Sequence, residues 1–509
     1  MTSSQPTAAG ASLLFTDLYQ LTMAQAYVRH GLHELPAQFD VFFRRPPDYG
    51  AHQAGYAVAA GAAELLDWMA EAALSADDEA RLRDLRSGAG GRLFDDAFLA
   101  WLRDRRGLAD VTLRAVPEGR VIHPVAPFAV VEAPLAVAQL LETSVLNHLN
   151  YPTLIATRAA RLRHAAAGRP LIEFGMRRGH GRAVDAGARA ALIGGVDASS
   201  NTGASLRLGV PPRGTHAHSF VQAVMATGGD ELDAFRAYAE TYPDDCLLLL
   251  DTVDTLESGL PNAIRVFEEL RAQRHEPRGV RLDSGDLAHL ALRVARELDA
   301  SGFPDAVITL SNQLDELTIW QIRQQIQDEA VSAGVDAQAV LDRLVFGVGT
   351  RLITSEGACA LDGVYKLVAV RHGGAWRPSA KRSDTPEKAT VPGPKALYRV
   401  FDARGMATAD LITLADERPQ PGEPLTLRHP ADERSRSLAA DEVSAVEPLL
   451  ETHWSEGRSR VEPQGIAELQ SRREADEARL DAGVKRLRHP HRYHVSLSER
   501  LWRLKQETA

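Results

Sequence analysis

The sequence predicts an α/β protein whose central part is a β/α barrel. From about residue 150, short apolar runs alternate with longer helical patterns, and this alternation is typical of a parallel sheet. The alternation repeats six or more times, and that number of repeats favours a barrel. The chain has 509 residues, which is enough for two or three domains or for one large barrel with additions.

The region before this core mixes helix and strand patterns. Thr16 or Asp17 is placed to cap a helix that contains Leu21, and residues 37–44 alternate in the manner of a strand. The further elements that we expect are a short strand at 56–61, helical patterns over 61–105, strands within 111–131 and a helix over 134–148. The region is therefore expected to be α+β.

The strands expected in the core are apolar runs that end in polar residues or glycine. They lie at residues 171–175, 192–195, 247–251, 279–283, 307–311 and 344–347. Clear helical patterns follow at 262–273, 287–299 and 315–333. The C-terminal region returns to strands, expected at 363–371, 396–401 and 406–414, and ends with a charged helix over 466–487 and a last helix that starts at 495–498.

Composition excludes several classes of protein. The net charge of −10 and the pI near 6 give no support for nucleic-acid binding. No apolar run approaches the roughly 20 residues of a membrane span, and the first residues lack a signal-peptide pattern, so we expect a cytoplasmic protein with no membrane partner. The two cysteines, Cys246 and Cys359, have no CxxC partner, which makes a disulfide framework or a zinc cage improbable.

Polar residues recur where the core strands end. In β/α barrels the ligand groups lie at the carboxyl ends of the strands, so these residues should meet in one site. They are Glu173, Asp251, Asp283, Ser311, Gly347 and Gly349. Carboxylates beside Arg281 are also what a Mg²⁺-bound phosphate ligand needs, although capping of the next helix is the commonest reason for an Asp at such a place.

Cationic and glycine-rich segments add candidate phosphate sites. Arg177 and Arg178 follow a glycine turn, and a guanidinium donates to phosphate or carboxylate in a bidentate fork; a solvated basic loop is the simpler alternative. Residues 346–351 resemble a phosphate loop, a weak signal when taken alone. The chain has six lysines, and four of them, Lys366, Lys381, Lys388 and Lys395, lie close together.

Two histidines follow a stretch of small polar residues over 194–220. Histidine can transfer protons, bind metal or accept a phosphoryl group near neutral pH, and at this point both His216 and His218 are open to each role. With the strand-end carboxylates, the cations and nearby aromatic residues, the set suggests a phosphorylated sugar substrate with a planar partner.

The chain resembles nicotinate phosphoribosyltransferases along almost its whole length. The matching segments stand in the order of that family, at residues 15–23, 173–178, 214–220, 281–287, 310–316, 347–350 and 390–393. The Ser-Asn segment of the family is present as Ser199-Ser200-Asn201, with slightly different surroundings.

The resemblance implies a type II phosphoribosyltransferase with an irregular β/α barrel and an α+β domain built from both chain ends. The expected divisions are residues 1–140, 141–362 and 363–509. It implies a homodimer with a shared active site. The implied reaction converts nicotinate and phosphoribosyl pyrophosphate to nicotinate mononucleotide and pyrophosphate, coupled to ATP hydrolysis, with Mg²⁺ bound mainly through pyrophosphate and Asp251 and Asp283 as possible ligands.

The resemblance also implies roles for single residues. His218 matches the family histidine that ATP phosphorylates, which excludes His216 from that role. Phe174 and Tyr19 would enclose the pyridine ring, with Tyr19 supplied by the neighbouring subunit. Thr215 would lie at the nicotinate site.

The remaining implied contacts concern the phosphoribosyl group. Arg281 would hold the nicotinate end or the ribose, and Asp283 is similar to the family acid near the ribose and Mg²⁺. Thr350, in the loop with Gly347 and Gly349, would bind the 5-phosphate. Arg177 and Lys381 are further candidates for substrate binding.

Four other functions compete with this interpretation. One is a non-enzymatic paralogue that only binds nucleotide, which the presence of the histidine and the acids opposes. Nicotinamide and quinolinate phosphoribosyltransferases are the nearest, and the Gly-Thr-x-Ala-His segment and the order of the segments oppose both. A metal-dependent barrel hydrolase would use His216 and His218 as ligands, and would need further ligands, for which His180 and His289 are the nearest candidates.

Overall fold

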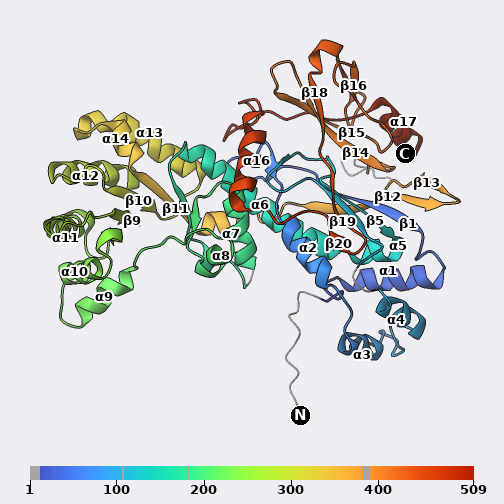
Figure 1. The fold of residues 1–509 in the computed structure, drawn as a ribbon, viewed down its shortest axis with the longest axis horizontal. Coiled ribbons are helices and arrows are strands. Elements are labelled where there is room, and N and C mark those ends of the chain that lie inside the picture. The colour runs from blue at the N-terminus through green and yellow to red at the C-terminus, as the bar shows by residue number, and fades with distance from the viewer. Residues whose placement is uncertain (1–11, 106–107, 182, 382–389, 509) are drawn as a thin grey trace. The chain divides into compact units, whose positions relative to one another are not determined.

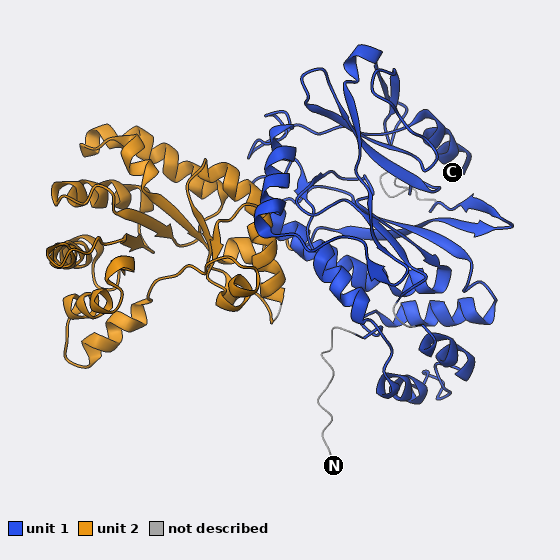
Figure 2. Ribbon diagram, in the orientation of Figure 1, with its two compact units in different colours: residues 1–157, 360–509 blue, residues 158–359 orange. Residues whose placement is uncertain are grey.

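The computed structural model describes residues 12–105, 108–181, 183–381 and 390–508. The chain forms two compact units, which Figure 2 shows in different colours. Unit 1 comprises Met1–Thr157 and Ala360–Ala509, and unit 2 comprises Arg158–Cys359. The helix α6 (Glu142–Ala166) contains the boundary at which the first segment of unit 1 ends.

Unit 1 is built around two sheets, of which the first is antiparallel and the second is mixed. One has seven strands in the order β13-β12-β1-β5-β3-β19-β20, and the other has six in the order β17-β16-β21-β15-β14-β18. The strands of the first are β1 (Pro36–Phe43), β3 (Thr112–Ala115), β5 (Ala129–Pro134), β12 (Gly363–His372), β13 (Ala375–Pro378), β19 (Glu451–Ser455) and β20 (Arg458–Ser459). Those of the second are β14 (Lys395–Phe401), β15 (Ala407–Leu414), β16 (Leu425–Arg428), β17 (Ser435–Leu438), β18 (Ala445–Pro448) and β21 (Val495–Leu497).

Helices and one small ribbon complete unit 1. The ribbon pairs β2 (Ala57–Val58) with β4 (Val121–Ile122). The helices are α1 (Leu18–Arg29), α2 (Ala62–Glu71), α3 (Ala76–Asp84), α4 (Asp96–Arg103), α5 (Leu135–Leu140), the first part of α6, α16 (Ile466–Ala478) and α17 (Glu499–Thr508). In the seven-stranded sheet β1 lies between β12 and β5, so strands from the two ends of the sequence share one sheet.

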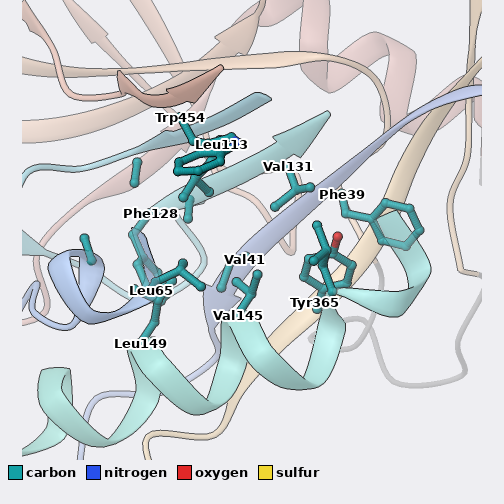
Figure 3. Close-up of a cluster of buried hydrophobic side chains, with 14 of the residues drawn as sticks. Phe39, Val41, Leu65, Leu113, Phe128, Val131, Val145, Leu149, Tyr365 and Trp454 are labelled. Carbon is teal, nitrogen blue, oxygen red and sulfur yellow. The ribbon is translucent and has the colours of Figure 1, made fainter. Parts of the chain in front are cut away.

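The core of unit 1 lies between this sheet and the helices against it. Figure 3 shows Val41 and Val131 on the strands, with Val145 and Leu149 reaching them from α6. Phe39 stacks on Tyr365 with ring centroids 4.7 Å apart. The buried Tyr365 hydroxyl donates to the Ala138 carbonyl at 2.7 Å, so its polar atom is satisfied inside the apolar cluster.

Unit 2 is a single parallel sheet with helices between its strands. The strand order is β7-β6-β11-β10-β9-β8, and every neighbouring pair is parallel. The strands are β6 (Leu171–Glu173), β7 (Ala198–Ser199), β8 (Leu247–Leu249), β9 (Gly279–Leu282), β10 (Val307–Ser311) and β11 (Leu344–Val348). Their alternation with helices confirms the α/β prediction for this part of the chain.

The helices of unit 2 connect these strands and cover the sheet. In Figure 1, α11, α12 and α13 lie along one side of β9, β10 and β11. The helices are α7 (Ala183–Ile193), α8 (Thr202–Arg207), α9 (His218–Ala226), α10 (Glu231–Thr241), α11 (Leu260–Ala272), α12 (Leu287–Ala300), α13 (Glu316–Ala333), α14 (Ala337–Asp342) and α15 (Thr350–Ile353).

The expected closure of this sheet into a barrel is not found. Among the described residues, β7 and β8 are the two edges of an open sheet and do not pair with each other. Both are short, with two and three residues. The chain between them forms α8, an extended segment, α9 and α10 but no further strand, so nothing there extends the hydrogen-bonded ladder from one edge to the other.

Three sequence-based assignments are wrong in type or extent. Residues 192–195, expected as a strand, are the end of α7 and the turn after it, where Gly195 has a φ of 101°. A short apolar run does not separate a strand from the buried end of a helix. Residues 495–497, expected to begin the last helix, form β21, which pairs with β15 before α17 starts at Glu499. The charged helix α16 also ends at Ala478, well before residue 487.

None of the helices that the structure describes combines the length and the apolar character needed to cross a membrane.

His123, directly after β4, makes the stability of unit 1 depend on pH. The side chain is fully buried, its ring stacks on that of Tyr493 with centroids 3.8 Å apart, and neither ring nitrogen has a hydrogen-bond partner among the described residues. Burial lowers the pKa of His123 to about 3. An exposed histidine has a pKa of about 6.5. Between about pH 6.5 and about pH 3, His123 is therefore protonated in the unfolded chain but neutral in the folded chain, and lowering the pH favours unfolding.

We therefore expect that the His123→Phe substitution, which keeps a ring for stacking, weakens the loss of stability on acidification. The free energy of unfolding of the wild type should fall by up to about 1.4 kcal/mol per pH unit more steeply than that of the variant between pH 6 and pH 4. Urea unfolding over this range measures the difference. His372→Phe, at an exposed position on β12, controls for the loss of a histidine; equal slopes for wild type and His123→Phe would contradict the prediction.

Candidate active site

A pocket of about 150 Å³ opens at the carboxyl edge of the unit 2 sheet. Its walls come from the last residues of β9, β10 and β11 and from the segments that follow these strands and β6. The lining residues are Phe174, Arg177, Arg178, Arg281, Asp283, Ser311, Asn312, Gln313, Leu314, Gly347, Gly349, Thr350 and Arg351. The sequence-predicted residues that meet here are thus Phe174, Arg177, Arg281, Asp283, Ser311, Gly347, Gly349 and Thr350.

Phe174 stands directly against Gly347 on the neighbouring strand. A Cβ at Gly347 would lie 2.4 Å from Cε2 of the Phe174 ring, which is far inside van der Waals contact. The Phe174 amide donates to the Val348 carbonyl at 2.8 Å, which holds the backbone beside β11. Gly347 is therefore required because only a residue without a side chain leaves room for the ring.

Arg281, Ser311 and Asp283 form one hydrogen-bonded group on the pocket floor. Arg281 Nε donates to Ser311 Oγ at 2.9 Å, and its Nη2 donates to Asp283 Oδ1 at 3.1 Å. The Ser311 hydroxyl donates to Asp283 Oδ1 at 2.5 Å. The guanidinium carbon lies 5.4 Å from the centroid of the Phe174 ring, so the group fixes a cation beside an aromatic face.

The carboxylates at the strand ends have different roles: some cap the following helix, and others face the pocket. Asp286 caps α12 by accepting from the amides of Ala288 and His289 at 3.2 and 3.1 Å. Asp283 does not cap α12, and it lines the pocket. Glu173 is fully buried, which raises its pKa, and it accepts from Ser199 Oγ at 2.6 Å and from the Gly175 amide. Glu173 therefore supports the turn after β6 and does not line the pocket.

The loop after β10 contributes residues that sequence reasoning did not assign. Asn312 and Gln313 line the pocket and have φ values of 103° and 50°. Such left-handed backbone costs on the order of 1–3 kcal/mol per residue, and it concentrates at functional sites. One feature of the sequence could have identified this loop. Asn312 comes immediately after a predicted strand, and asparagine tolerates left-handed backbone better than most residues. Leu314 also lines the pocket without having been singled out, whereas Arg178 and Arg351, which line it too, lie in the segments expected to bind phosphate.

His218, the first residue of α9, lies between two of the strand-end carboxylates. Its Nε2 is 3.9 Å from Asp251 Oδ1 and 3.9 Å from Asp283 Oδ2, and its Nδ1 is 3.1 Å from Thr252 Oγ1. The Asp251 side chain is only 5% exposed, and Ser284 donates to its Oδ2 at 2.5 Å. Asp251 Oδ1 is buried and has no hydrogen-bond partner among the described residues. An imidazole in this position is a candidate nucleophile for a covalent step.

His216 has a different environment from His218. It is buried, its Nε2 accepts from the Leu249 amide at 3.2 Å, and its ring packs against Tyr238 with centroids 4.8 Å apart. Burial lowers its pKa to about 4, so the ring is neutral at pH 7. Because Nε2 is already occupied, His216 and His218 do not form a metal-binding pair. Among the described residues, no group of three or more His, Cys, Asp or Glu side chains is arranged to hold a metal ion.

Besides Glu173, Asp251 and His218, three further predicted residues lie outside the pocket walls. Thr215 is half-buried, and its hydroxyl donates to the His216 carbonyl at 3.1 Å. Tyr19 and Lys381 belong to unit 1. Tyr19 is 48% exposed on α1, and partial burial together with the nearby Glu142 raises its pKa to about 12. Lys381 is exposed, and its amide donates to Thr390 Oγ1 at 2.9 Å.

The lysine cluster separates into residues with different surroundings. Lys395 is fully buried, with its Nζ 2.8 Å from Asp40 Oδ2, so it ties β14 to β1 inside unit 1. Lys366 is half-buried on β12. Lys388 lies outside the described residues.

The contact between Phe174 and Gly347 gives a testable prediction. Gly347→Ala should lower the free energy of unfolding by about 1–3 kcal/mol, because the new methyl group overpacks against the ring. Adding Phe174→Ala to Gly347→Ala should recover part of the loss, since the clash is removed. Urea unfolding measures both, with Gly203→Ala as control, where a Cβ would come no closer than 3.5 Å to Arg207 Nη1. A Gly347→Ala variant as stable as the wild type would refute the proposed contact.

Comparison with known proteins places this geometry in a family. Family models of the nicotinate phosphoribosyltransferase (NAPRTase) N-terminal domain, the NAPRTase family and its C-terminal domain match residues 14–150, 170–405 and 394–505. The chain is 39% identical to nicotinate phosphoribosyltransferase of Bacillus subtilis, over 97% of this chain and 94% of the relative. It is 34% identical to the enzyme of that name from Homo sapiens, over 97% and 96% of the two chains.

A solved structure agrees with the sequence relatives. The crystal structure of human nicotinic acid phosphoribosyltransferase superposes with a TM-score of 0.77 and 32% identity, covering 97% of this chain and 99% of the human chain. A nicotinate-nucleotide pyrophosphorylase from Pyrococcus furiosus, 21% identical with a TM-score of 0.66 over 94% and 99% of the two chains, shares the fold. With family models along most of its length and relatives above 30% identity over nearly all of it, this chain belongs to the nicotinate phosphoribosyltransferase family.

Proposed function

We propose that this chain transfers a phosphoribosyl group from phosphoribosyl pyrophosphate to nicotinate, which yields nicotinate mononucleotide and pyrophosphate. The reaction is the entry of nicotinate into NAD synthesis, and we assign it to the cytoplasm. The observation that carries the proposal is the pocket in which an aromatic ring, Phe174, lies beside the Arg281–Asp283–Ser311 group, within a chain related over its full length to enzymes of this name.

The pocket offers complementary groups to each part of the substrates. A flat pyridine ring can stack on Phe174, and the Arg281 guanidinium beside that ring suits the nicotinate carboxylate or the ribose. The loop of Gly347, Gly349 and Thr350 presents small residues to the 5-phosphate, and Arg177 adds a cation at the rim. Thr215 and Lys381 are proposed as further contacts to the nicotinate and to the phosphates.

The bond change follows from these positions. The pyridine nitrogen forms a bond to C1 of the ribose while the bond from C1 to the pyrophosphate oxygen breaks, and its electron pair leaves with pyrophosphate. Positive charge develops on the ribose ring in this step, and the Asp283 carboxylate, which faces the pocket, stabilises it. Holding the ring against Phe174 aims the nitrogen at C1 and supplies the proximity that the step needs.

Mg²⁺ suits the donors present at this edge. The buried Asp251 Oδ1 lacks a hydrogen-bond partner among the described residues, and Asp283 faces the pocket, so two carboxylates are available to a hard cation. When bound, Mg²⁺ neutralises the charge of the departing pyrophosphate. We propose that pyrophosphate supplies most of its ligands, because the described residues hold no larger cluster of protein ligands.

We also propose that ATP hydrolysis is coupled to the reaction through His218. An imidazole nitrogen attacks the γ-phosphorus, the bond to the β-phosphate oxygen breaks, and ADP leaves with that electron pair. The phosphohistidine is later hydrolysed to free phosphate. Asp251 and Asp283, each 3.9 Å from Nε2, would orient the ring for this attack.

The proposed assembly is a homodimer in which Tyr19 of one subunit closes the nicotinate site of the other. Tyr19 is a half-exposed aromatic residue next to Leu18, which is 53% exposed, and large exposed apolar side chains of this kind are typical of interaction sites. Within each chain, we propose that residues 141–362 form the catalytic core around the open parallel sheet, which residues 1–140 and 363–509 complete with an α+β domain.

The substrate is tested directly by turnover. Purified protein is incubated with phosphoribosyl pyrophosphate, Mg²⁺ and ATP, and with nicotinate, nicotinamide or quinolinate in separate reactions. We expect the mononucleotide of nicotinate to form fastest, as measured by chromatography with ultraviolet detection. A preference for nicotinamide or quinolinate would overturn the substrate assignment.

The two histidines give a second test, in which the rates with and without ATP are compared. His218→Ala should reduce the ATP stimulation to about one, because the phosphoryl acceptor is lost. His216→Ala should lower stability but keep the stimulation, because the ratio does not depend on how much protein is folded. Equal loss in both variants, with recovery on addition of zinc, would instead support the metal-dependent hydrolase.

A further inference from the structure

The loop over residues 312–314 is held from both ends. On one side, Ser311 is fixed by its hydrogen bonds to Arg281 and Asp283. Two consecutive side-chain-bearing residues in the loop have left-handed backbone, which persists only where the surroundings impose it. The contacts made by residues 314–316, on the C-terminal side of the loop, therefore help to determine the shape of one pocket wall.

On that other side the chain enters α13 through buried, charged contacts. Leu314 is 2% exposed, and Glu316 is completely buried. Glu316 Oε2 lies 2.8 Å from Arg158 Nε, and its Oε1 accepts from Arg161 Nε at 3.0 Å. These contacts fix the first turn of α13 against the part of α6 that belongs to unit 2.

Asp315, between the loop and this turn, uses its two oxygens for different partners. Oδ1 accepts from the Thr318 amide at 2.8 Å and so caps α13. Oδ2 accepts from Arg351 Nη1 at 2.5 Å. The Asp315 side chain is 11% exposed, and that of Arg351 is 31% exposed, so the ion pair is partly shielded from water.

Arg351 comes from the next pocket loop. It follows Gly349 and Thr350 after β11 and itself lines the pocket. The Asp315–Arg351 pair thus connects the loop after β10 to the start of the short helix α15, of which Arg351 is the second residue. The loop over residues 312–314 lies outside the described helices and strands, and the charge-assisted hydrogen bond holds it against the first turn of α15.

We propose that Asp315 and Arg351 are positioning residues that clamp the loop 312–314 and the start of α15, residues 349–351, in the geometry that receives the phosphoribosyl group. Asp315 acts through the loops and does not line the pocket. The nature of the substrate rests on the proposed function, whereas the clamp itself rests on the contacts described above.

The Asp315→Asn substitution separates the clamp from the helix cap. Asparagine retains one side-chain oxygen for the Thr318 amide and is an equally good capping residue, but its amide group cannot accept from Arg351. The matched control is Asp336→Asn. Asp336 is exposed and caps α14 by accepting from the Ala339 amide at 2.7 Å, and it faces no arginine in the described structure.

We expect Asp315→Asn to raise the KM for phosphoribosyl pyrophosphate about tenfold, the equivalent of one charge-assisted hydrogen bond. The KM for nicotinate and kcat should change by less than about threefold, since the Phe174 wall and the reacting groups are untouched. Asp336→Asn should leave all three constants unchanged. Arg351→Gln removes the same contact from the other loop, and the double variant should lose no more than the worse single variant.

Amide hydrogen exchange, followed by mass spectrometry on the substrate-free full-length protein, tests the clamp without turnover. Peptides covering residues 310–318 and 347–353 should exchange faster in Asp315→Asn and in Arg351→Gln than in the wild type or Asp336→Asn. Unchanged exchange in both clamp variants, or additive effects of the two substitutions on KM, would overturn the inference. If the wild type fails to use nicotinate, the proposed function falls, while hydrogen exchange still decides whether the clamp exists.

Discussion

Parallel pairing of neighbouring strands is the constraint on which the pocket of unit 2 depends. Because β6, β11, β10 and β9 run in one direction, their carboxyl ends lie along one edge, and residues far apart in the sequence become neighbours. The ladder places Ser311 opposite Gly347, and Leu310 opposite Leu282. A shift of one residue in β9 would turn Arg281 to the other face of the sheet, a shift in β10 would turn Ser311, and either would break up the Arg281–Asp283–Ser311 group.

The pocket combines close packing of an aromatic ring with arginine side chains whose orientation is fixed by hydrogen bonds. Gly347 admits the Phe174 ring, and Asp283 and Ser311 hold the Arg281 guanidinium next to it. Arg351 is oriented in the same manner by Asp315. A guanidinium held in this way needs no reorganisation when an anionic substrate arrives, and preorganisation of that kind is the main source of electrostatic stabilisation in enzymes.

Residues of the same type take different roles according to their surroundings. His216 is enclosed by aromatic rings and keeps a neutral imidazole, whereas His218, two positions later, lies between Asp251 and Asp283. Asp254 caps the helical turn after it, as Asp286 caps α12, which leaves Asp251 and Asp283 for the site. In both aspartate pairs, the residue closer to the strand serves the site and the residue three positions later serves the helix.

The sequence by itself determined the α/β class, five of the six parallel strands and the residues that gather at their carboxyl ends, because burial pattern and spacing are local properties. The sequence also identified the family, because the matching segments are each contiguous in the chain. It misassigned residues 192–195 as a strand, because a buried helix end and a buried strand are equally apolar. Only the tertiary structure decided that β7 and β8 remain open edges, that Asn312 and Gln313 adopt left-handed backbone, and that Arg351 meets Asp315. Those features depend on contacts between segments that are distant in the sequence, and no local pattern encodes which partner a charged or strained residue will find.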